Sequence, residues 1–402
     1  MRTANRELMR EWNTKVMLNL IRERKAISQV EISKKTGLSA GTVANITREL
    51  RKRGFIKNIA QGKSHGGRRP ITFCFNSKAM YVISVALLGA ETEIAILDMD
   101  GNIQEKVSYP TRHERGEEVV FKNLTRQAKL LLSQLSIPKD KVIALCVSVE
   151  GIVDADTGSL LFSSHFGWRD VPVKSILGKL LSLRTFVEGD KRTMALGEYC
   201  FGIGKKASNM VCIDIGAGIG AGLISNGQIH HGIHQMEGEI GHTLVLPDGP
   251  LCQCGKRGCL ELVASGSAIL RRARESLKKG EKTSISKRTI QLPDREAIRI
   301  IFQAAEKGDS LASMILQDAG HYLGLAIAAV VNYADPELVV LTGYVAEEDP
   351  GVLLKILRNI YEKEVFGKEL RKVKIVKGKL GEDAVLVGAA SLAYQDMFSL
   401  PH

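Results

Sequence analysis

Residues 241–259 read Gly-His-Thr-Leu-Val-Leu-Pro-Asp-Gly-Pro-Leu-Cys-Gln-Cys-Gly-Lys-Arg-Gly-Cys, and this stretch carries the most specific signal in the chain. Nine residues separate one imidazole, that of His242, from three crowded thiols. Three thiolates and one imidazole complete a closed tetrahedral zinc site. Two glycines within the run allow a short loop to fold back around one ion. We therefore predict one structural zinc ion per chain, bound by His242, Cys252, Cys254 and Cys259.

Free cysteines and a redox pair are the alternatives for this cluster. A redox role needs an exposed thiolate of low pKa with a resolving partner, which spacing alone does not show. The chain has seven cysteines, an odd number with three in one short run, which is unlike a disulfide framework. A receptor in which these cysteines sense zinc or redox state stays open as an alternative function.

Strand and helix patterns alternate from residue 80 onward. The pattern opens strand-strand-strand-helix-strand, with Asp100-Gly101 as a hairpin turn signal. Such alternation is typical of an α/β architecture, here expected in two lobes that flank a cleft. The expected strands are 81–88, 93–99, 103–109, 141–149, 210–215 and 338–341, and the expected helices are 117–135, 191–201, 260–278, 294–306, 310–333, 351–362 and 383–394.

The sequence around the cysteines resembles the signature of the ROK family of sugar kinases and repressors. Glu239-Ile-Gly-His242, followed by Cys252-x-Cys254-Gly-x-x-Gly-Cys259-x-Glu261, carries the resemblance. The glycine-rich run 213–222 looks like the family's second phosphate loop, and Gly151-Ile-Val-Asp154 and Gly167-Trp168 match further landmarks. The resemblance spans residues 80–395. It implies an actin-like ATPase fold, a sugar in the interlobe cleft, and a homodimer or homotetramer.

The phosphate-binding positions decide between kinase and sensor. ROK kinases begin this domain with Asp-x-Gly-Gly-Thr-Lys, and the positions that correspond here include Ala86, Leu88, Ala90 and Glu91. In the second loop, Ala217 replaces a hydroxyl-bearing residue, and Tyr344 replaces the second residue of a Gly-Gly pair. Phosphoryl transfer depends on positioning and charge stabilisation. We therefore expect a degenerate kinase with no catalytic residues, and keep an ATP-dependent sugar kinase with a DNA-binding head as the alternative.

The sugar side of the resemblance is better preserved. Asp190 aligns with the family's catalytic Asp, and Glu239, His242 and Glu261 align with its hydroxyl-binding residues. Carboxylates and imidazole accept hydrogen bonds from adjacent hydroxyls, which suits a sugar or polyol. Gly189 and His165 stand at two positions where the family's kinases often have Asn, so the identity of the ligand stays open. The alternative is that these acids are only surface residues.

The excess of positive over negative charge is confined to the first fifth of the chain. Residues 1–80 carry 18 Lys/Arg and 5 Asp/Glu, whereas the remainder carries 38 Lys/Arg against 39 Asp/Glu. Concentrated basicity points to a polyanion, and nucleic acid is the first candidate because neutralised phosphates release counterions.

The basic head has the pattern of a helix-turn-helix. Ser28 and Glu31 have the spacing of a capping box, Gly37 suits a tight turn, and Ser39 opens a second helix. In this motif the second helix enters the major groove of DNA, and Asn and Arg suit readout of adenine and guanine. The residues expected to face DNA are Ser39, Ala40, Thr42, Asn45 and Arg48.

A β-hairpin wing is expected after this motif. Residues 55–59 and 71–75 are strand-like, and Gly67-Arg68-Arg69-Pro70 lies between them. Arginines in such a tip suit a narrow minor groove, so Arg68 and Arg69 complete the predicted DNA contacts. A solvated charged helix pair with a linker is the alternative.

Length and hydropathy bound the remaining choices. At 402 residues the chain suits more than one domain, and we expect a winged helix-turn-helix in residues 1–78 and a ROK domain in 79–402. The N-terminus is polar and no apolar run suggests a membrane span, so we expect a cytoplasmic protein. These features predict a sugar- or polyol-responsive repressor that binds a palindromic double-stranded operator.

Overall fold

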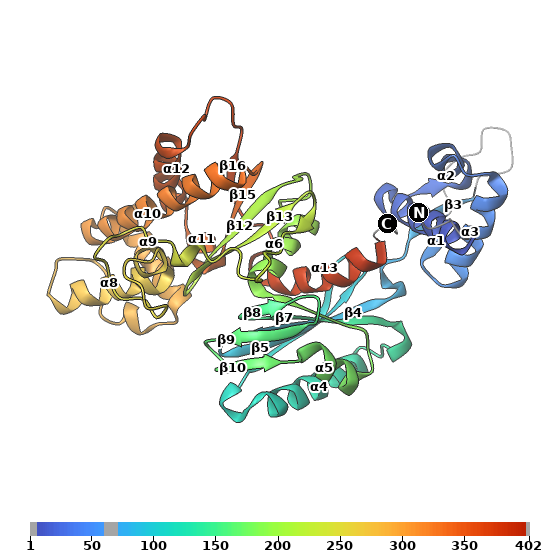
Figure 1. The fold of residues 1–402 in the computed structure, drawn as a ribbon, viewed down its shortest axis with the longest axis horizontal. Helices are drawn as coiled ribbons and strands as arrows, with labels where there is room; N and C mark the ends of the chain where they lie inside the picture. Colours follow the sequence, from blue (N-terminus) through green and yellow to red (C-terminus); the bar gives the residue numbers. More distant parts are fainter. Residues whose placement is uncertain (1–5, 60–70, 399–402) are drawn as a thin grey trace. The chain divides into compact units, whose positions relative to one another are not determined.

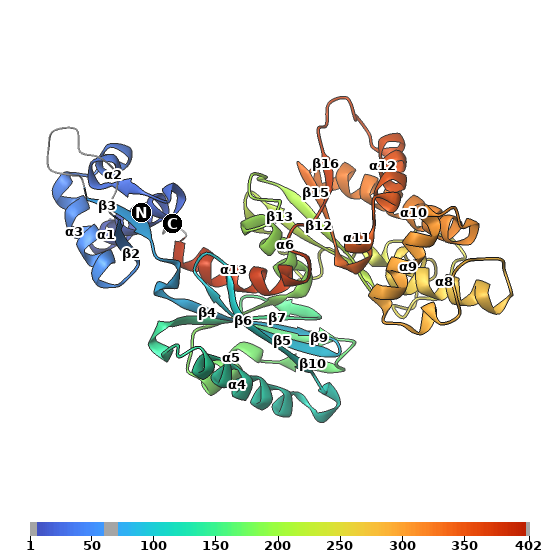
Figure 2. The ribbon, with the colours of Figure 1, turned by 180° about the vertical axis from the view of Figure 1, so that it is seen from behind.

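The computed structural model describes residues 6–59 and 71–398. Its internal contacts divide the chain into two compact units, whose elements are labelled in Figures 1 and 2. The first unit consists of Met1–Glu150, Ala155–Val187 and Ala389–His402, and the second of Gly151–Asp154 and Glu188–Gly388. The domain boundary expected between residues 78 and 79 was drawn from sequence resemblance, whereas the two units are defined by internal contacts. The expected boundary therefore stays a prediction.

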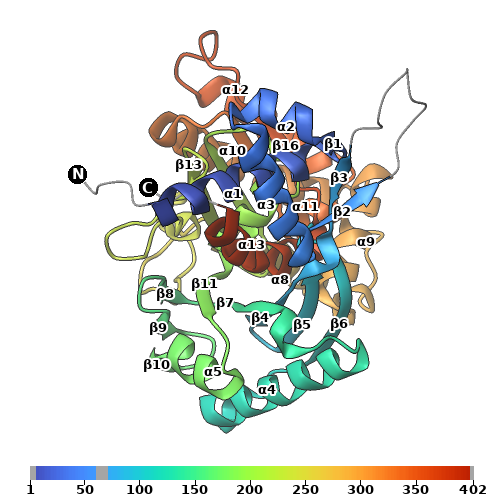
Figure 3. The same ribbon diagram turned by 90° about the vertical axis from the view of Figure 1, so that its right-hand side faces the viewer.

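The N-terminal head has the expected helices and a small antiparallel sheet (Figure 3). Ser28 and Glu31 form the predicted capping box, and Gly37 ends the first of the paired helices with φ 70°. The side chain of Ser39 caps the second by accepting a hydrogen bond from Thr42 N–H. The elements are α1 Arg6–Arg24, β1 Ile27–Ser28, α2 Gln29–Thr36, α3 Ala40–Lys52, β2 Ile56–Ile59 and β3 Thr72–Phe75, with sheet order β1-β3-β2.

The second part of the first unit is built on a mixed five-stranded sheet in the order β11-β7-β4-β5-β6. Its strands are β4 Tyr81–Leu88, β5 Glu91–Asp98, β6 Ile103–Pro110, β7 Val142–Val149 and β11 Thr185–Gly189, and its helices are α4 Glu117–Gln134 and α5 Val173–Leu181. The β4–β5 pair is antiparallel and the β4–β7 pair is parallel. The strands predicted at 81–88 and 141–149 are thus confirmed to within one residue.

A small sheet follows residue 150, where no strand is predicted before residue 210. It contains β8 Ile152–Asp154, β9 Ser159–Ser163 and β10 Trp168–Val171, in the order β10-β9-β8. Strands of three to five residues are too short to show a clear alternation of polar and apolar residues.

The second unit has another mixed sheet, in the order β14-β13-β12-β15-β16. Its strands are β12 Met210–Ile215, β13 Ile219–Ser225, β14 Gln228–Ile229, β15 Leu338–Thr342 and β16 Lys374–Lys377. Its helices are α6 Asp190–Cys200, α7 Glu261–Ala264, α8 Gly266–Lys278, α9 Asp294–Glu306, α10 Ser310–Ala334, α11 Gly343–Glu348 and α12 Val352–Glu364, and the chain's last helix is α13 Ala384–Phe398. The helix predicted over 260–278 is split at Ser265, whose side chain caps α8.

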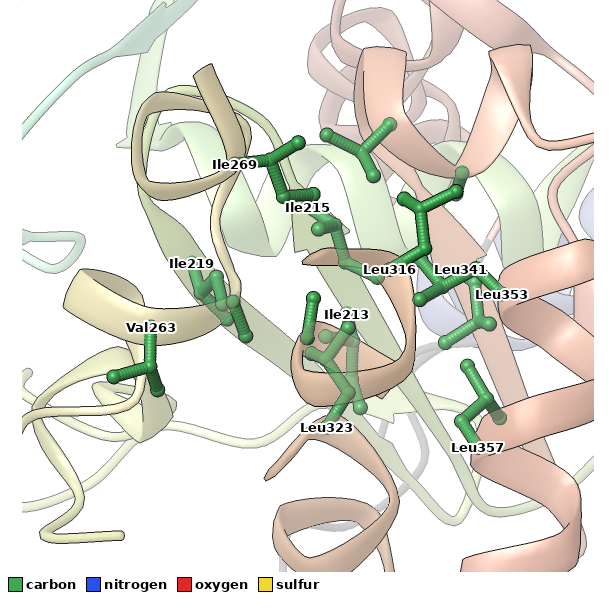
Figure 4. Close-up of a cluster of buried hydrophobic side chains, with 14 of the residues drawn as sticks. Ile213, Ile215, Ile219, Val263, Ile269, Leu316, Leu323, Leu341, Leu353 and Leu357 are labelled. Atoms are coloured by element: carbon green, nitrogen blue, oxygen red, sulfur yellow. The ribbon is translucent and has the colours of Figure 1, made fainter. Parts of the chain in front are cut away.

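The core of the second unit lies between this sheet and its helices (Figure 4). Ile213 of β12 and Leu341 of β15 meet Leu316 of α10 and Leu353 of α12 within one buried cluster. Each of these four side chains is no more than 3% exposed. This core gives a fixed base to the turns that carry the candidate site.

Helix α10 corrects the expectation that no segment could span a membrane. By length and composition Ser310–Ala334 could cross a bilayer. However, 56% of its most apolar window is buried, and it packs in the core of the second unit. A buried core helix is apolar for the same reason as a membrane helix, so hydropathy alone does not distinguish them.

Candidate metal centre and ligand site

The four predicted metal ligands converge in the second unit. One donor atom from each of the four residues lies within 4.8 Å of the others. His242 Nδ1 lies 3.6 Å from Cys252 Sγ, and Cys254 Sγ lies 3.6 Å from Cys259 Sγ. Cys252 and Cys259 are buried, whereas Cys254 is exposed. The sequence therefore brings these four side chains to one point.

These distances fit a tetrahedral zinc site. Zinc–sulfur bonds of about 2.3 Å and zinc–nitrogen bonds of about 2.0 Å give tetrahedral edges of roughly 3.5–3.8 Å. The Cys252–His242 and Cys254–Cys259 separations of 3.6 Å agree with that value, and all four donor atoms lie within 4.8 Å of one another. A hydrogen bond from Lys256 N–H lowers the pKa of the Cys254 thiol to about 7. One thiolate is therefore available near neutral pH to begin binding a metal.

Two glycines fold the cysteine loop as the sequence analysis expected. Gly255 and Gly258 have φ values of 87° and 70°. A Cβ at Gly258 would collide with the carbonyl of Leu246, whereas Gly255 lies in open space. Cys252 N–H donates to Lys256 O at 2.7 Å, which closes the loop. The loop thus needs glycine at 258 for both conformation and space.

His242 links the metal centre to the candidate ligand residues. Its Nδ1 lies 3.5 Å from Glu261 Oε1, and its Nε2 lies 3.9 Å from Glu239 Oε2. Cys252 Sγ–H donates to the same Glu261 oxygen at 3.1 Å. The Nδ1 edge of the ring therefore faces the thiol cluster, and the Nε2 edge faces Glu239.

Asp190 belongs to the same electrostatic cluster. Burial raises the pKa of Glu239, and Asp190 and Glu261 raise it further while His242 and Lys191 lower it. Asp190 is 8% exposed at the start of α6, and the Glu239 side chain is 56% exposed. The structure thus gathers all four predicted ligand residues, and whether they bind a sugar stays a prediction.

Sequence reasoning missed two charged residues beside Asp190. Lys191 Nζ lies 2.8 Å from Asp190 Oδ2 and 2.7 Å from Asp214 Oδ2. A signal was available in Asp214, which is the one charged residue within the otherwise apolar strand β12. The lysine gave no such signal, because it lies on a helix where charged residues are ordinary.

Arg192 supports the loop that carries Glu239. Its guanidinium forms ion pairs with Glu188 at 2.6 Å and Glu237 at 2.7 Å, and donates to Val153 O at 2.8 Å. All three side chains are at most 10% exposed. Arg192 therefore joins α6, β8 and the loop before Glu239 in one buried polar network.

The positions predicted to have lost phosphate-binding residues lie in two turns, and side chains of the chain itself pack against both turns. Leu88 pairs with Glu91 across the β4–β5 hairpin, and Gly89 N–H donates to Glu150 Oε2 at 2.7 Å. In the second unit, a Cβ at Gly266 would collide with the Tyr344 hydroxyl. A carboxylate and a phenol ring thus lie next to the backbone of these two turns.

The predicted DNA-facing residues lie on one side of α3. Ser39, Ala40, Asn45 and Arg48 are exposed and Thr42 is partly exposed, whereas Val43, Ile46 and Leu50 are buried. Arg48 Nη1 donates to Asn45 Oδ1 at 3.2 Å. Arg10 of α1 forms a 2.6 Å ion pair with Glu49, which ties α1 to α3. The predicted wing residues Arg68 and Arg69 lie outside the described residues.

Comparisons with known proteins agree with both parts of this arrangement. Residues 82–396 match the ROK family, and residues 13–57 match a winged helix-turn-helix DNA-binding family. The chain is 30% identical to the DNA-binding transcriptional dual regulator NagC of Escherichia coli K12, over 98% of this chain and 95% of that protein. It is also 30% identical to the xylose repressor of Caldicellulosiruptor bescii, over 99% of each chain.

A solved structure has a similar fold over nearly the same length. It is the crystal structure of a ROK family transcriptional regulator, described as a homolog of the E. coli MLC protein. The TM-score is 0.82 with 26% sequence identity, and the match covers 97% of each chain. The likeness therefore includes the head as well as the body.

Proposed function

The chain belongs to the ROK family, and on that premise we propose that it is a DNA-binding transcriptional repressor controlled by a sugar or polyol. One observation carries this proposal. The same chain has an exposed polar side of α3 that could contact DNA and a cluster of candidate ligand residues around Asp190. The two named relatives are a transcriptional regulator and a repressor, and this chain matches them over almost their whole length. DNA as the partner also implies a cytoplasmic protein.

The ligand is proposed to bind at Asp190, Glu239, His242 and Glu261. Four groups that accept hydrogen bonds within one cluster suit adjacent hydroxyls of a polyol. We propose zinc as the ion that holds His242 in place, because the donor set and the edge lengths fit that metal. One ligating nitrogen fixes the ring, so the opposite nitrogen is presented toward Glu239 in a constant orientation.

We propose that the protein does not phosphorylate its ligand. In support, Glu150 accepts from Gly89 N–H, and Tyr344 packs against the glycine turns. Both groups oppose the approach of a triphosphate, one by charge and the other by volume. A coupled ADP-release assay over hexoses, amino sugars, pentoses and inositols tests this, and turnover at ordinary kinase rates would contradict it.

DNA recognition is tested on the full-length protein. An operator is selected from a genomic fragment library, and its affinity is measured by fluorescence anisotropy. Asn45→Ala should weaken specific binding by about 1–3 kcal/mol, because that amide is placed to read a base edge. Unchanged affinity for the selected operator would argue against α3 as the reading helix.

Arg48 provides a second test with a matched control. Arg48→Ala removes an exposed charge from α3, and Arg288→Ala removes an exposed charge from the second unit. Only the first should weaken operator binding strongly, since the second changes net charge alone. Adding a sugar panel to the bound complex then tests control by ligand, with release of DNA as the expected response.

The operator is proposed to be palindromic and the protein a homodimer or homotetramer. A two-fold symmetric assembly places two heads on half-sites that are related by the same symmetry. Light scattering with and without operator measures the assembly. A monomer bound to a single half-site would contradict this part of the proposal.

A further inference from the structure

Lys191 is held between two carboxylates inside the candidate ligand site. Its Nζ lies 2.8 Å from Asp190 Oδ2 and 2.7 Å from Asp214 Oδ2, and both aspartate side chains are 12% exposed. Burial opposes the charge, but the two aspartates outweigh it and hold the pKa of Lys191 well above its ordinary value. The ammonium group is therefore a permanent cation with two of its three N–H donors already engaged.

The lysine also accounts for part of the glycine-rich run. A Cβ at Gly220 would lie 3.1 Å from Lys191 Cγ and Cε, and one at Gly222 would collide with the Lys191 carbonyl. A Cβ at Gly343 would collide with Asp214 Oδ1. These three glycines thus make room for Lys191 and Asp214, and the Lys191–Asp214 pair lies against the glycine turns.

The charge balance around Asp190 disfavours an anionic ligand. Two carboxylates share one ammonium, and Glu239 and Glu261 act on the same cluster. A phosphate monoester brings a charge of roughly −1.5 to −2 near neutral pH. It would have to compete with Asp190 and Asp214 for the ammonium. A hydroxyl brings no charge, and its oxygen can accept the third N–H of Lys191.

We propose that Lys191 and Asp214 are specificity-determining residues that make this site accept a free hydroxyl and reject a phosphorylated sugar. This inference rests on the proposed sugar-binding function, because it states that the sugar bound at that site is uncharged. Lys191 orients Asp190 as a hydrogen-bond acceptor, and Asp214 keeps the ammonium from serving as a phosphate site.

The test compares free and phosphorylated members of sugar pairs by calorimetry on the zinc-loaded, full-length protein. The probes are D-glucose with glucose 6-phosphate, and N-acetyl-D-glucosamine with its 6-phosphate. The wild type should bind the free member of a pair at least about tenfold more tightly than the phosphorylated member. Preference for the phosphorylated member would overturn the proposal that the site rejects phosphorylated sugars, but it would leave the proposed sugar function intact. Absence of binding by every free and phosphorylated probe would count against the proposed sugar function itself.

Asp214→Asn gives a readout that needs no sugar. The amide keeps the shape of the side chain but frees the ammonium, so affinity for inorganic phosphate should rise at least about tenfold. The double variant Asp214→Asn with Lys191→Met should lose that gain. Asp318→Asn is the matched control, because it neutralises another ion-paired aspartate, 2.5 Å from Arg272, in the same unit. No gain in a folded, zinc-containing Asp214→Asn protein would overturn the proposal.

Discussion

At the scale of single residues, the orientation of His242 would connect the proposed metal site to the proposed ligand site. One edge of the ring faces Cys252 and Glu261, and the other faces Glu239. A metal bound on the first edge therefore determines how the second edge is presented. Loss of the ion would free the ring to rotate, so we expect ligand affinity to depend on metal content.

Cys259→Ser should abolish stoichiometric zinc binding. The Cys259 thiol is fully buried in the cluster, and a neutral serine hydroxyl is a poor substitute for a thiolate ligand. Zinc per chain, measured by elemental analysis, should fall from about one to near zero. Cys74→Ser is the control, since Cys74 lies in β3 of the head. Retention of zinc by the Cys259 variant would contradict the assignment.

The residues of the site were predictable to different degrees. His242 and the three cysteines could be recognised because the spacing and chemistry of their side chains are rare in combination. Lys191 could not, because its role depends on Asp214, which is distant in sequence and is brought near by the packing of α6 on β12. An ion pair between two elements that are far apart in the chain leaves no pattern in the sequence around either residue.

At the scale of elements, helix caps explain why most boundaries were predicted well. Helix α2 begins with a capping box at Ser28 and ends at Gly37, and both signals are local in sequence. Strand β13 was missed because its glycines suggested a phosphate loop. Two of those glycines instead allow α6 to pack closely, which only the tertiary structure reveals.

The cap of α10 predicts acid sensitivity. Asp309 is partly buried, but hydrogen bonds from Ala312 N–H, Ser284 and Thr283 outweigh that burial and lower its pKa to about 2. A lowered pKa means that the ionised form stabilises the fold above the unfolded value of 3.8. This stabilisation should be lost as the pH falls from about 4 to about 2.

Asp309→Asn tests this dependence. The amide retains one acceptor for Ala312 N–H but has no charge to titrate, so the loss of stability between pH 4 and pH 2 should become smaller than in the wild type. The free energy of unfolding is measured by denaturant titration at each pH. Asp248→Asn, at an exposed aspartate, is the control. An identical pH profile for wild type and Asp309→Asn would contradict the role of this cap.

At the scale of the whole molecule, the last helix belongs to both compact units. Residues 384–388 of α13 belong to the second unit, and residues from 389 onward belong to the first. Gly197 of α6 lies so close to α13 that a Cβ there would collide with Ala384 O. At the other end, Asn19 of α1 donates to Phe398 O at 2.9 Å. One continuous helix therefore contributes residues to both units.

Phe398→Ala should loosen the attachment of the head. The Phe398 ring is 9% exposed, lies 4.6 Å from the Arg22 guanidinium, and meets the Phe75 ring edge-on. Its removal should cost about 2 kcal/mol or more, because it deletes a buried aromatic side chain. Hydrogen exchange in α1 should accelerate correspondingly. Tyr333→Ala, at a 94% exposed ring, is the control and should leave that exchange unchanged.

Because α13 belongs to both units, this helix also offers an optical test of the proposed control of DNA binding by ligand. Met397 lies near the end of this helix and lines a hollow of about 560 Å³ with Leu18, Leu50 and Phe55 of the head. A small environment-sensitive dye attached at position 397 would lie against these side chains of the head. Its emission would then follow sugar addition and operator capture in real time, in a cuvette, without radiolabel or gel.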